Sequence, residues 1–222
     1  MVPEPKIVIT GTGRAGTTLL VSVLTHLGLD TGEADGKLSG VDARTRGGLE
    51  SLLDSPDAPR IVKDTTLPFR LGKLLEAGTV SVSHVIVPIR SLDLAAASRV
   101  RGSNYGRNIF ARGGLWGTVN PVKQRDALAV MLYELMFTIA KYELAHTLLE
   151  FPRFTTDWEY THRALSFLAP GRPATDFRDA LAAVVRTDLI HEEPLDANER
   201  WRARRHSIRL KLSAAEKRAN ET

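Results

Sequence analysis

The chain opens with a short apolar run, a glycine-rich turn and an amphipathic stretch, in that order. Residues 7–10 are rich in β-branched side chains and lie between Pro5 and Gly11, which is typical of a buried parallel strand. The turn spans residues 11–16. Apolar side chains then recur at helical spacing as far as Gly28, at Leu20, Val23, Leu24 and Leu27. The pattern predicts a strand, a glycine loop and a helix over 17–27.

The same alternation recurs further along the chain. Residues 60–63 and 83–89 predict two more short strands, and helices are expected over 68–76 and 92–100. Strands that alternate with helices are joined by right-handed crossovers into a parallel sheet that is covered on both faces. We therefore expect a three-layer α/β/α fold with a central parallel sheet, in a single domain over residues 1–222.

The second half of the chain has a different pattern. Residues 101–122 are rich in glycine and arginine and include Tyr105, Phe110 and Trp116, which is typical of a mobile lid loop. The remaining expected elements are a long helix over 125–150, a fourth strand over 154–156, helices over 161–168 and 176–185, and a fraying basic helix over 207–222.

The composition is that of an ordinary globular domain. Of the 222 residues, 43% are hydrophobic and 25% are charged, which excludes disorder and a fibrous repeat. No cysteine is present, so disulfides and cysteine-ligated metals are excluded. A net charge of +4 favours anionic ligands but does not indicate nucleic acid. We find no targeting signal, and the most apolar stretch, 127–140, is shorter than the roughly 20 residues of a membrane span. A cytoplasmic protein without a membrane span is expected.

Most of the chemical information lies in residues 11–18, GTGRAGTT. A glycine loop between a strand and a helix directs backbone N–H groups into one concavity at the positive end of the helix dipole, which binds phosphate or sulfate. Arg14 adds a permanent positive charge, and Thr17 and Thr18 add hydroxyl donors. A purely structural turn needs neither the arginine nor both threonines.

Two well-known classes of nucleotide-binding loop fit this stretch incompletely. In the frame of a nucleoside-triphosphatase loop, Thr17 stands where the lysine should be, and the third strand ends at Arg90 rather than at a magnesium-binding aspartate. The spacing of Gly11, Gly13 and Gly16 matches a dinucleotide-binding loop. However, residues 29–40 do not form the second strand that such a fold needs.

A third class fits better. Residues 9–20, ITGTGRAGTTLL, resemble the sulfonate-binding loop of the sulfotransferases, which bind 3′-phosphoadenosine 5′-phosphosulfate (PAPS). A second signature of that family is a strand that ends in arginine, followed eight positions later by a helical serine. Arg90 and Ser98 have this spacing. Taken alone, Arg90 would be a surface cation and Ser98 a small packing residue.

The resemblance implies a set of PAPS-binding residues. The 5′-phosphosulfate would be held by Gly11, Thr12, Gly13, Arg14, Ala15, Gly16, Thr17 and Thr18, and the 3′-phosphate by Arg90 and Ser98. The two signatures predict two separate cationic cradles, one for each anionic end. A late family segment that contacts the nucleotide is similar to the stretch with Trp201 and Arg202. There, Trp201 would stack on adenine or cap the core.

The resemblance also suggests catalytic residues. Lys63 and Asp64 end the second strand and are similar to the lysine-led forms of the family, in which this segment lines the reaction centre. Arg14 and Lys63 would stabilise the charge of the leaving oxygen. The family's histidine base is replaced by threonines, so Glu33, in a Gly-Glu context, is the leading candidate for the base and Asp64 the second.

The expected function is transfer of a sulfonate group from PAPS to a hydroxyl or amine of a small-molecule, lipid or carbohydrate acceptor, leaving 3′-phosphoadenosine 5′-phosphate (PAP). No metal is expected, and a homodimer is possible. Two alternatives stay open: a small-molecule kinase with an atypical loop, and a nucleotide-binding module without catalysis.

Overall fold

The apolar runs of the sequence form one parallel sheet. The computed structural model describes residues 3–33, 48–108, 113–186, 190 and 193–219. Its strands are β1 (Pro5–Ile9), β2 (Ile61–Lys63), β3 (Ser81–Ile89) and β4 (His146–Glu150), in the order β2-β1-β3-β4. All three strand pairs are parallel, with Ile7 opposite Ile61 and Val85 opposite His146.

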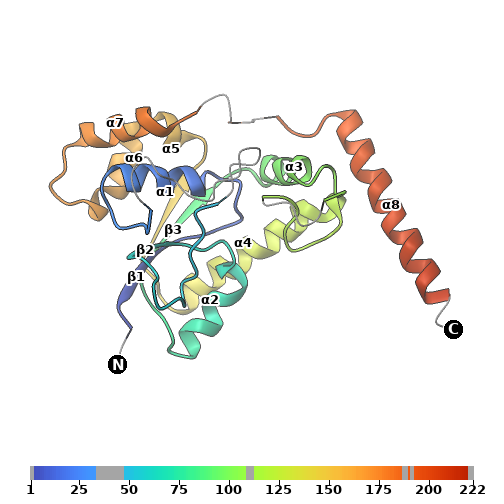
Figure 1. Cartoon of the computed structure of the whole chain (residues 1–222), viewed down its shortest axis with the longest axis horizontal. Coiled ribbons are helices and arrows are strands. Elements are labelled where there is room, and N and C mark those ends of the chain that lie inside the picture. Colours follow the sequence, from blue (N-terminus) through green and yellow to red (C-terminus); the bar gives the residue numbers. More distant parts are fainter. Residues whose placement is uncertain (1–2, 34–47, 109–112, 187–189, 191–192, 220–222) are drawn as a thin grey trace.

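Helices cover both faces of this sheet (Figure 1). One face packs on α1 (Thr17–His26), α5 (Arg153–Thr156), α6 (Trp158–Leu165) and α7 (Ala174–Val184). The other face is covered by α2 (Leu67–Glu76), α4 (Gln124–Lys141) and, packed against α4, α3 (Leu92–Gly102). Ile7 and Ile9 point into the first core and Val8 into the second, as the two-residue period of a strand requires. The α/β fold with a covered parallel sheet is confirmed.

The first half of the chain follows its predicted elements closely. β1, α1, β2, α2, β3 and α3 all form, each within two residues of the expected limits. Two short 3₁₀ turns, η1 (Pro121–Lys123) and η2 (Ser166–Leu168), also occur. The expected helix over 161–168 is α6 continued by η2, and the one over 176–185 is α7.

The prediction of one helix over 125–150 is wrong. The helix ends at Lys141, Glu143 adopts a positive φ of 50°, and residues 146–150 form β4. Five consecutive pairs join β4 to β3, from Val85–His146 to Ile89–Glu150. The helix propensity of this stretch is overridden because pairing with a central strand satisfies the same backbone groups and buries Leu149.

The prediction of a strand over 154–156 is also wrong, since these residues belong to the short helix α5. Phe154 is fully buried in the core beneath α1. The sheet thus has a fourth strand, but it lies eight residues earlier than expected, at residues 146–150.

The basic C-terminal stretch forms α8 (Ala197–Ala219), which projects away from the sheet (Figure 1). Its first turns dock on the end of α3, where Ala203 packs with Val100 and Leu115. Within the described part of the chain, no helix is both long and apolar enough to cross a bilayer.

Candidate functional site

The carboxyl ends of the strands meet at one edge of the sheet. Lys63 ends β2, the loop 11–16 follows β1, and Arg90 follows β3. β1 and β3 are neighbours in the centre of the sheet. The chain goes from β1 to β2 at one edge of the sheet, and from β3 to β4 at the opposite edge. Parallel sheets bind ligands in the crevice at such a reversal of strand order, so the loop and Arg90 flank the expected binding position.

Left-handed backbone positions give the loop its tight curl. Gly13, Arg14 and Gly16 have φ values of 66°, 56° and 79°. Arg14 is the unusual member, because a non-glycine residue adopts this conformation at a cost and does so most often at functional sites. Gly16 precedes α1 and supplies no side-chain cap, so the N–H groups of the first helical turn have no side-chain capping partner there.

The two sequence signatures come together in one cluster. Arg14 Nε donates a hydrogen bond of 2.9 Å to Ser98 Oγ, and Arg90 Nη1 donates one of 3.0 Å to the backbone carbonyl of Arg14. Arg90 is buried, with its guanidinium 5.0 Å from the ring centroid of Phe151. The residues expected in two separate cradles therefore form one connected group in the structure.

A third arginine, which the sequence analysis did not select, joins this cluster. Arg99 lies in α3 next to Ser98 and is only 6% exposed. It donates to the carbonyl of Thr12 through Nη2 at 2.7 Å and Nε at 3.2 Å. Burial, and secondly the charge of Arg14, lower the pKa of Arg99 to about 9. The signal in the sequence is an arginine within the otherwise apolar and small run that surrounds Ser98.

Lys63 connects the loop to a second unexpected residue. This buried lysine donates to Thr18 Oγ1 at 3.0 Å, to the carbonyl of Gly48 and to Glu50 Oε1 at 2.7 Å. The Glu50 side chain is 45% exposed, and its other oxygen accepts from the backbone N–H and hydroxyl of Thr65 at 3.3 Å. Glu50 is thus a carboxylate beside the loop with access to solvent, and it has no motif by which the sequence could reveal it.

Asp64 is buried and has structural partners. One carboxylate oxygen accepts from the backbone N–H and the hydroxyl of Thr66 at 2.9 and 2.6 Å, just before α2. The other accepts from Leu53 N–H at 3.3 Å and lies 3.6 Å from Arg70 Nη1. These contacts fix the entry to α2, so Asp64 is poorly placed to exchange a proton with a substrate.

The other predicted site residues are distributed as follows. Gly11 packs against β3, where an added Cβ would lie 3.4 Å from Val87. Thr12, Ala15 and Thr17 are buried within the loop and its helix. Glu33 is half-buried and lies at the end of a described segment.

Trp201 and Arg202 lie on α8, away from the loop. Trp201 is 59% exposed and stacks with Arg205, so it does not cap the core. Arg202 lies over the ring of Tyr105, 5.4 Å from its centroid. Within the described residues, neither side chain contacts the loop, Arg90 or Ser98.

Part of the expected lid is anchored. The backbone of Trp116 exchanges two hydrogen bonds of 2.8 Å with the side chain of Gln124, and the Gly114 carbonyl accepts from Arg99. Residues 109–112, which include Phe110, lie outside the described residues. Closure of residues 101–122 over an acceptor stays a prediction.

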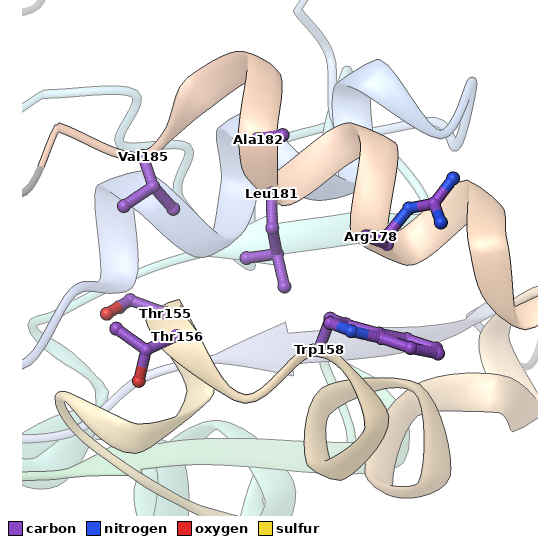
Figure 2. A pocket seen from close by; sticks show the side chains of 7 residues that line it. All are labelled: Thr155, Thr156, Trp158, Arg178, Leu181, Ala182 and Val185. Atoms are coloured by element: carbon purple, nitrogen blue, oxygen red, sulfur yellow. The ribbon is translucent and has the colours of Figure 1, made fainter.

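An open cavity of about 330 Å³ lies elsewhere, between α5–α6 and α7 (Figure 2). None of the predicted site residues lines it; the lining residues are Thr155, Thr156, Trp158, Arg178, Leu181, Ala182 and Val185. Among the described residues, no group of three or more His, Asp or Glu side chains is arranged to hold a metal ion.

Comparison with known proteins does not add to this picture. No family model matches the chain, and no curated protein is significantly similar to it in sequence.

Proposed function

We propose that the protein is a PAPS-dependent sulfotransferase with a P-loop-like core. The observation that supports this most is the pair of hydrogen bonds that joins Arg14 to Ser98 and Arg90 to the Arg14 carbonyl. Residues 84 and 76 positions apart in the sequence, selected from two independent motifs, lie at one sheet edge.

The charge of the cluster suits a ligand with two anionic ends. Arg14 and Arg90 place two guanidinium groups at one loop, beside the N-terminus of α1, and the buried Arg99 adds a third positive charge behind it. Guanidinium groups bind phosphate and sulfate through paired hydrogen bonds. Ser98 Oγ accepts from Arg14 and keeps its own proton to donate to an anion. We expect the loop and Arg14 to bind the 5′-phosphosulfate of PAPS, and Arg90 with Ser98 to bind its 3′-phosphate, with the ribose between them.

Two further side chains have proposed roles in the transfer. PAPS, when bound, supplies an activated sulfonate group whose leaving oxygen gains negative charge. Lys63, in contact with Thr18 at the start of α1, stabilises that charge together with Arg14. Glu50, bound to Lys63 and accessible to solvent, accepts the proton that the acceptor hydroxyl or amine loses as its bond to sulfur forms. Glu50 replaces Asp64 in this role because the Asp64 carboxylate holds the start of α2. Glu33, the base that the resemblance implies, stays the alternative.

A binding panel tests the proposal against its alternatives. Thermal stability would be measured with PAP, with ATP plus Mg²⁺, and with NADPH. A ligand that binds only the folded state raises the melting temperature, and we expect PAP to raise it by several degrees while the other two have little effect. Stabilisation by ATP plus Mg²⁺ and not by PAP would instead indicate the kinase.

Turnover separates the enzyme from a binding module. Labelled PAPS would be incubated with panels of phenols, glycans and lipids, and labelled product separated from PAPS. Transfer to any class identifies the acceptor, whereas PAP binding with no transfer across the panels would indicate the non-catalytic module. The proposed cytoplasmic location and a homodimer are tested by fractionation and by light scattering.

A further inference from the structure

Arg99 connects two parts of the chain that are far apart in sequence. Its Nε and Nη2 groups donate hydrogen bonds to the carbonyl of Thr12 in the loop. Its Nη1 group donates a hydrogen bond of 2.7 Å to the carbonyl of Gly114. The planar, fixed fork of a guanidinium can hold two acceptors at once in this way. The described partners of Arg99 are therefore backbone carbonyls on either side of α3.

This buried charge has no ion-pair partner among the described residues. The groups that bind it are neutral, the charge of Arg14 opposes it, and Glu50 acts on it only through space. A buried cation without a carboxylate is unfavourable unless something else compensates for it. The three hydrogen bonds to backbone carbonyls compensate in part, and an anion at the loop would supply the rest.

The contact also fixes the direction of the loop's peptide groups. In a trans peptide, the carbonyl of one residue and the N–H of the next point in opposite directions. The Thr12 carbonyl faces Arg99 and the Arg14 carbonyl faces Arg90, so the N–H groups of Gly13 and Ala15 point away from these arginines. Arg99 fills the space beside Gly13, since an added Cβ there would lie 2.4 Å from Arg99 Nη2.

The other end of the contact lies beside apolar side chains next to α2. Gly114 is followed by Trp116, which is held by Gln124. Gly117 lies close to Phe69 and Met131, with 3.8 Å from its Cβ position to Phe69 Cζ. Phe69 is largely exposed at the start of α2, near the sheet edge where Lys63 lies. Residues 114–117 thus border the space next to the loop.

We propose that Arg99 is a positioning residue that couples the anion-binding loop to residues 114–117. Anion binding at the preformed loop compensates the buried charge of Arg99 and, through the same guanidinium, strengthens its contact with Gly114. This orders the acceptor side of the crevice when the donor is in place. The identity of the anion as PAP or PAPS rests on the proposed function, whereas the coupling does not.

The test compares Arg99→Met and Arg99→Lys with the wild type and with Arg125→Met, which removes an exposed arginine of α4 that pairs with Asp93. Affinity for PAP and for inorganic pyrophosphate would be measured by calorimetry. Hydrogen exchange of residues 113–120 would be followed with and without each ligand.

In the wild type and in Arg125→Met, we expect the bound anion to slow exchange over residues 113–120. In Arg99→Met, affinity should fall about tenfold or more, the size expected for losing a charge-assisted contact, and the protection should disappear. Arg99→Lys keeps the charge but cannot bridge both carbonyls, so it should recover part of the affinity and little of the protection.

The outcomes separate the two proposals. A wild type that binds pyrophosphate but not PAP contradicts the proposed function, while Arg99 is still tested with pyrophosphate. Wild-type affinity and protection in a folded Arg99→Met variant overturn the role of Arg99. If that variant does not fold, full protection in Arg99→Lys overturns it. Failure of the wild type to bind either anion overturns both.

Discussion

Gly16 lies against two phenylalanine rings of the core and gives a quantitative test of how the loop is packed. An added Cβ at this position would lie 2.7 Å from Phe151 Cδ2 and 2.8 Å from Phe154 Cζ. Both rings are buried, with centroids 5.8 Å apart, so they cannot swing aside freely. Gly16→Ala therefore forces a methyl group into a filled core as well as into a left-handed backbone conformation.

Gly171→Ala is the matched control. Gly171 has a φ of 82°, against 79° for Gly16, and nothing lies within 4 Å of its Cβ position. The left-handed conformation costs both alanines roughly 1–2 kcal/mol, partly offset by about 0.4–1 kcal/mol from the stiffer unfolded chain. Overpacking adds about 1–3 kcal/mol to Gly16→Ala alone. We expect losses of about 1 kcal/mol for Gly171→Ala and about 2–4 kcal/mol for Gly16→Ala.

The free energies of unfolding would be measured by urea titration and the melting temperatures by calorimetry. For a chain of this length, each kcal/mol corresponds to about 2–4 °C, so the two melting temperatures should differ by roughly 2–12 °C. Because Phe151 also carries the Arg90 guanidinium, PAP affinity should fall in Gly16→Ala and not in Gly171→Ala. Equal destabilisation of the two variants would refute the reasoning, since it would mean that the rings move aside at no cost.

Three further changes test other parts of the site. Arg90→Ala should weaken binding of PAP far more than binding of adenosine 5′-phosphosulfate in calorimetry; equal losses would mean that Arg90 does not read the 3′-phosphate. Glu50→Gln should lower kcat by about 10²–10⁴-fold and change PAP affinity little, whereas a kcat near that of the wild type would exclude Glu50 as the base; Glu33→Gln is its control. The hydrogen bonds from Arg101 lower the pKa of Glu199 to about 2 from 4.5, so this ion pair stabilises the docking of α8 above about pH 4.5. That contribution is lost as the pH falls through about 2. The protection factors of the α8 amides, which correct for the intrinsic pH dependence of exchange, should therefore fall over this range, and a Glu199→Gln variant that kept the same acid dependence would contradict this assignment.

The parts of the fold that the sequence predicts well are those decided locally. β1, the loop and α1 follow from a β-branched run, closely spaced glycines and a helical period that stops at Gly28. The end of α4 is instead decided by contacts with a distant part of the chain. Residues 142–145 contain neither glycine nor proline, and only the five pairs with β3 make a strand of the residues that follow.

The residues of the site also divide into those that local sequence reveals and those that only distant contacts reveal. The loop, Arg90 and Ser98 could be selected because their spacing along the chain carries the chemistry. Arg99 and Glu50 could not, because their importance comes from contacts with Thr12 and with Lys63 across 87 and 13 residues. Trp201 was selected by its residue type and neighbours, but α8 carries it out from the body of the protein.

The hydrogen bonds from Arg99 to the Thr12 carbonyl and from Arg90 to the Arg14 carbonyl also affect how fast a ligand binds. Side chains from α3 and from the end of β3 hold the Thr12 and Arg14 peptides as soon as the chain has folded, so little conformational freedom remains to be lost on binding. A preformed site of this kind binds its anionic ligand at a rate governed by diffusion and by the attraction of opposite charges. Raising the ionic strength should therefore slow capture, while the residence time should respond mainly to changes in the arginines themselves.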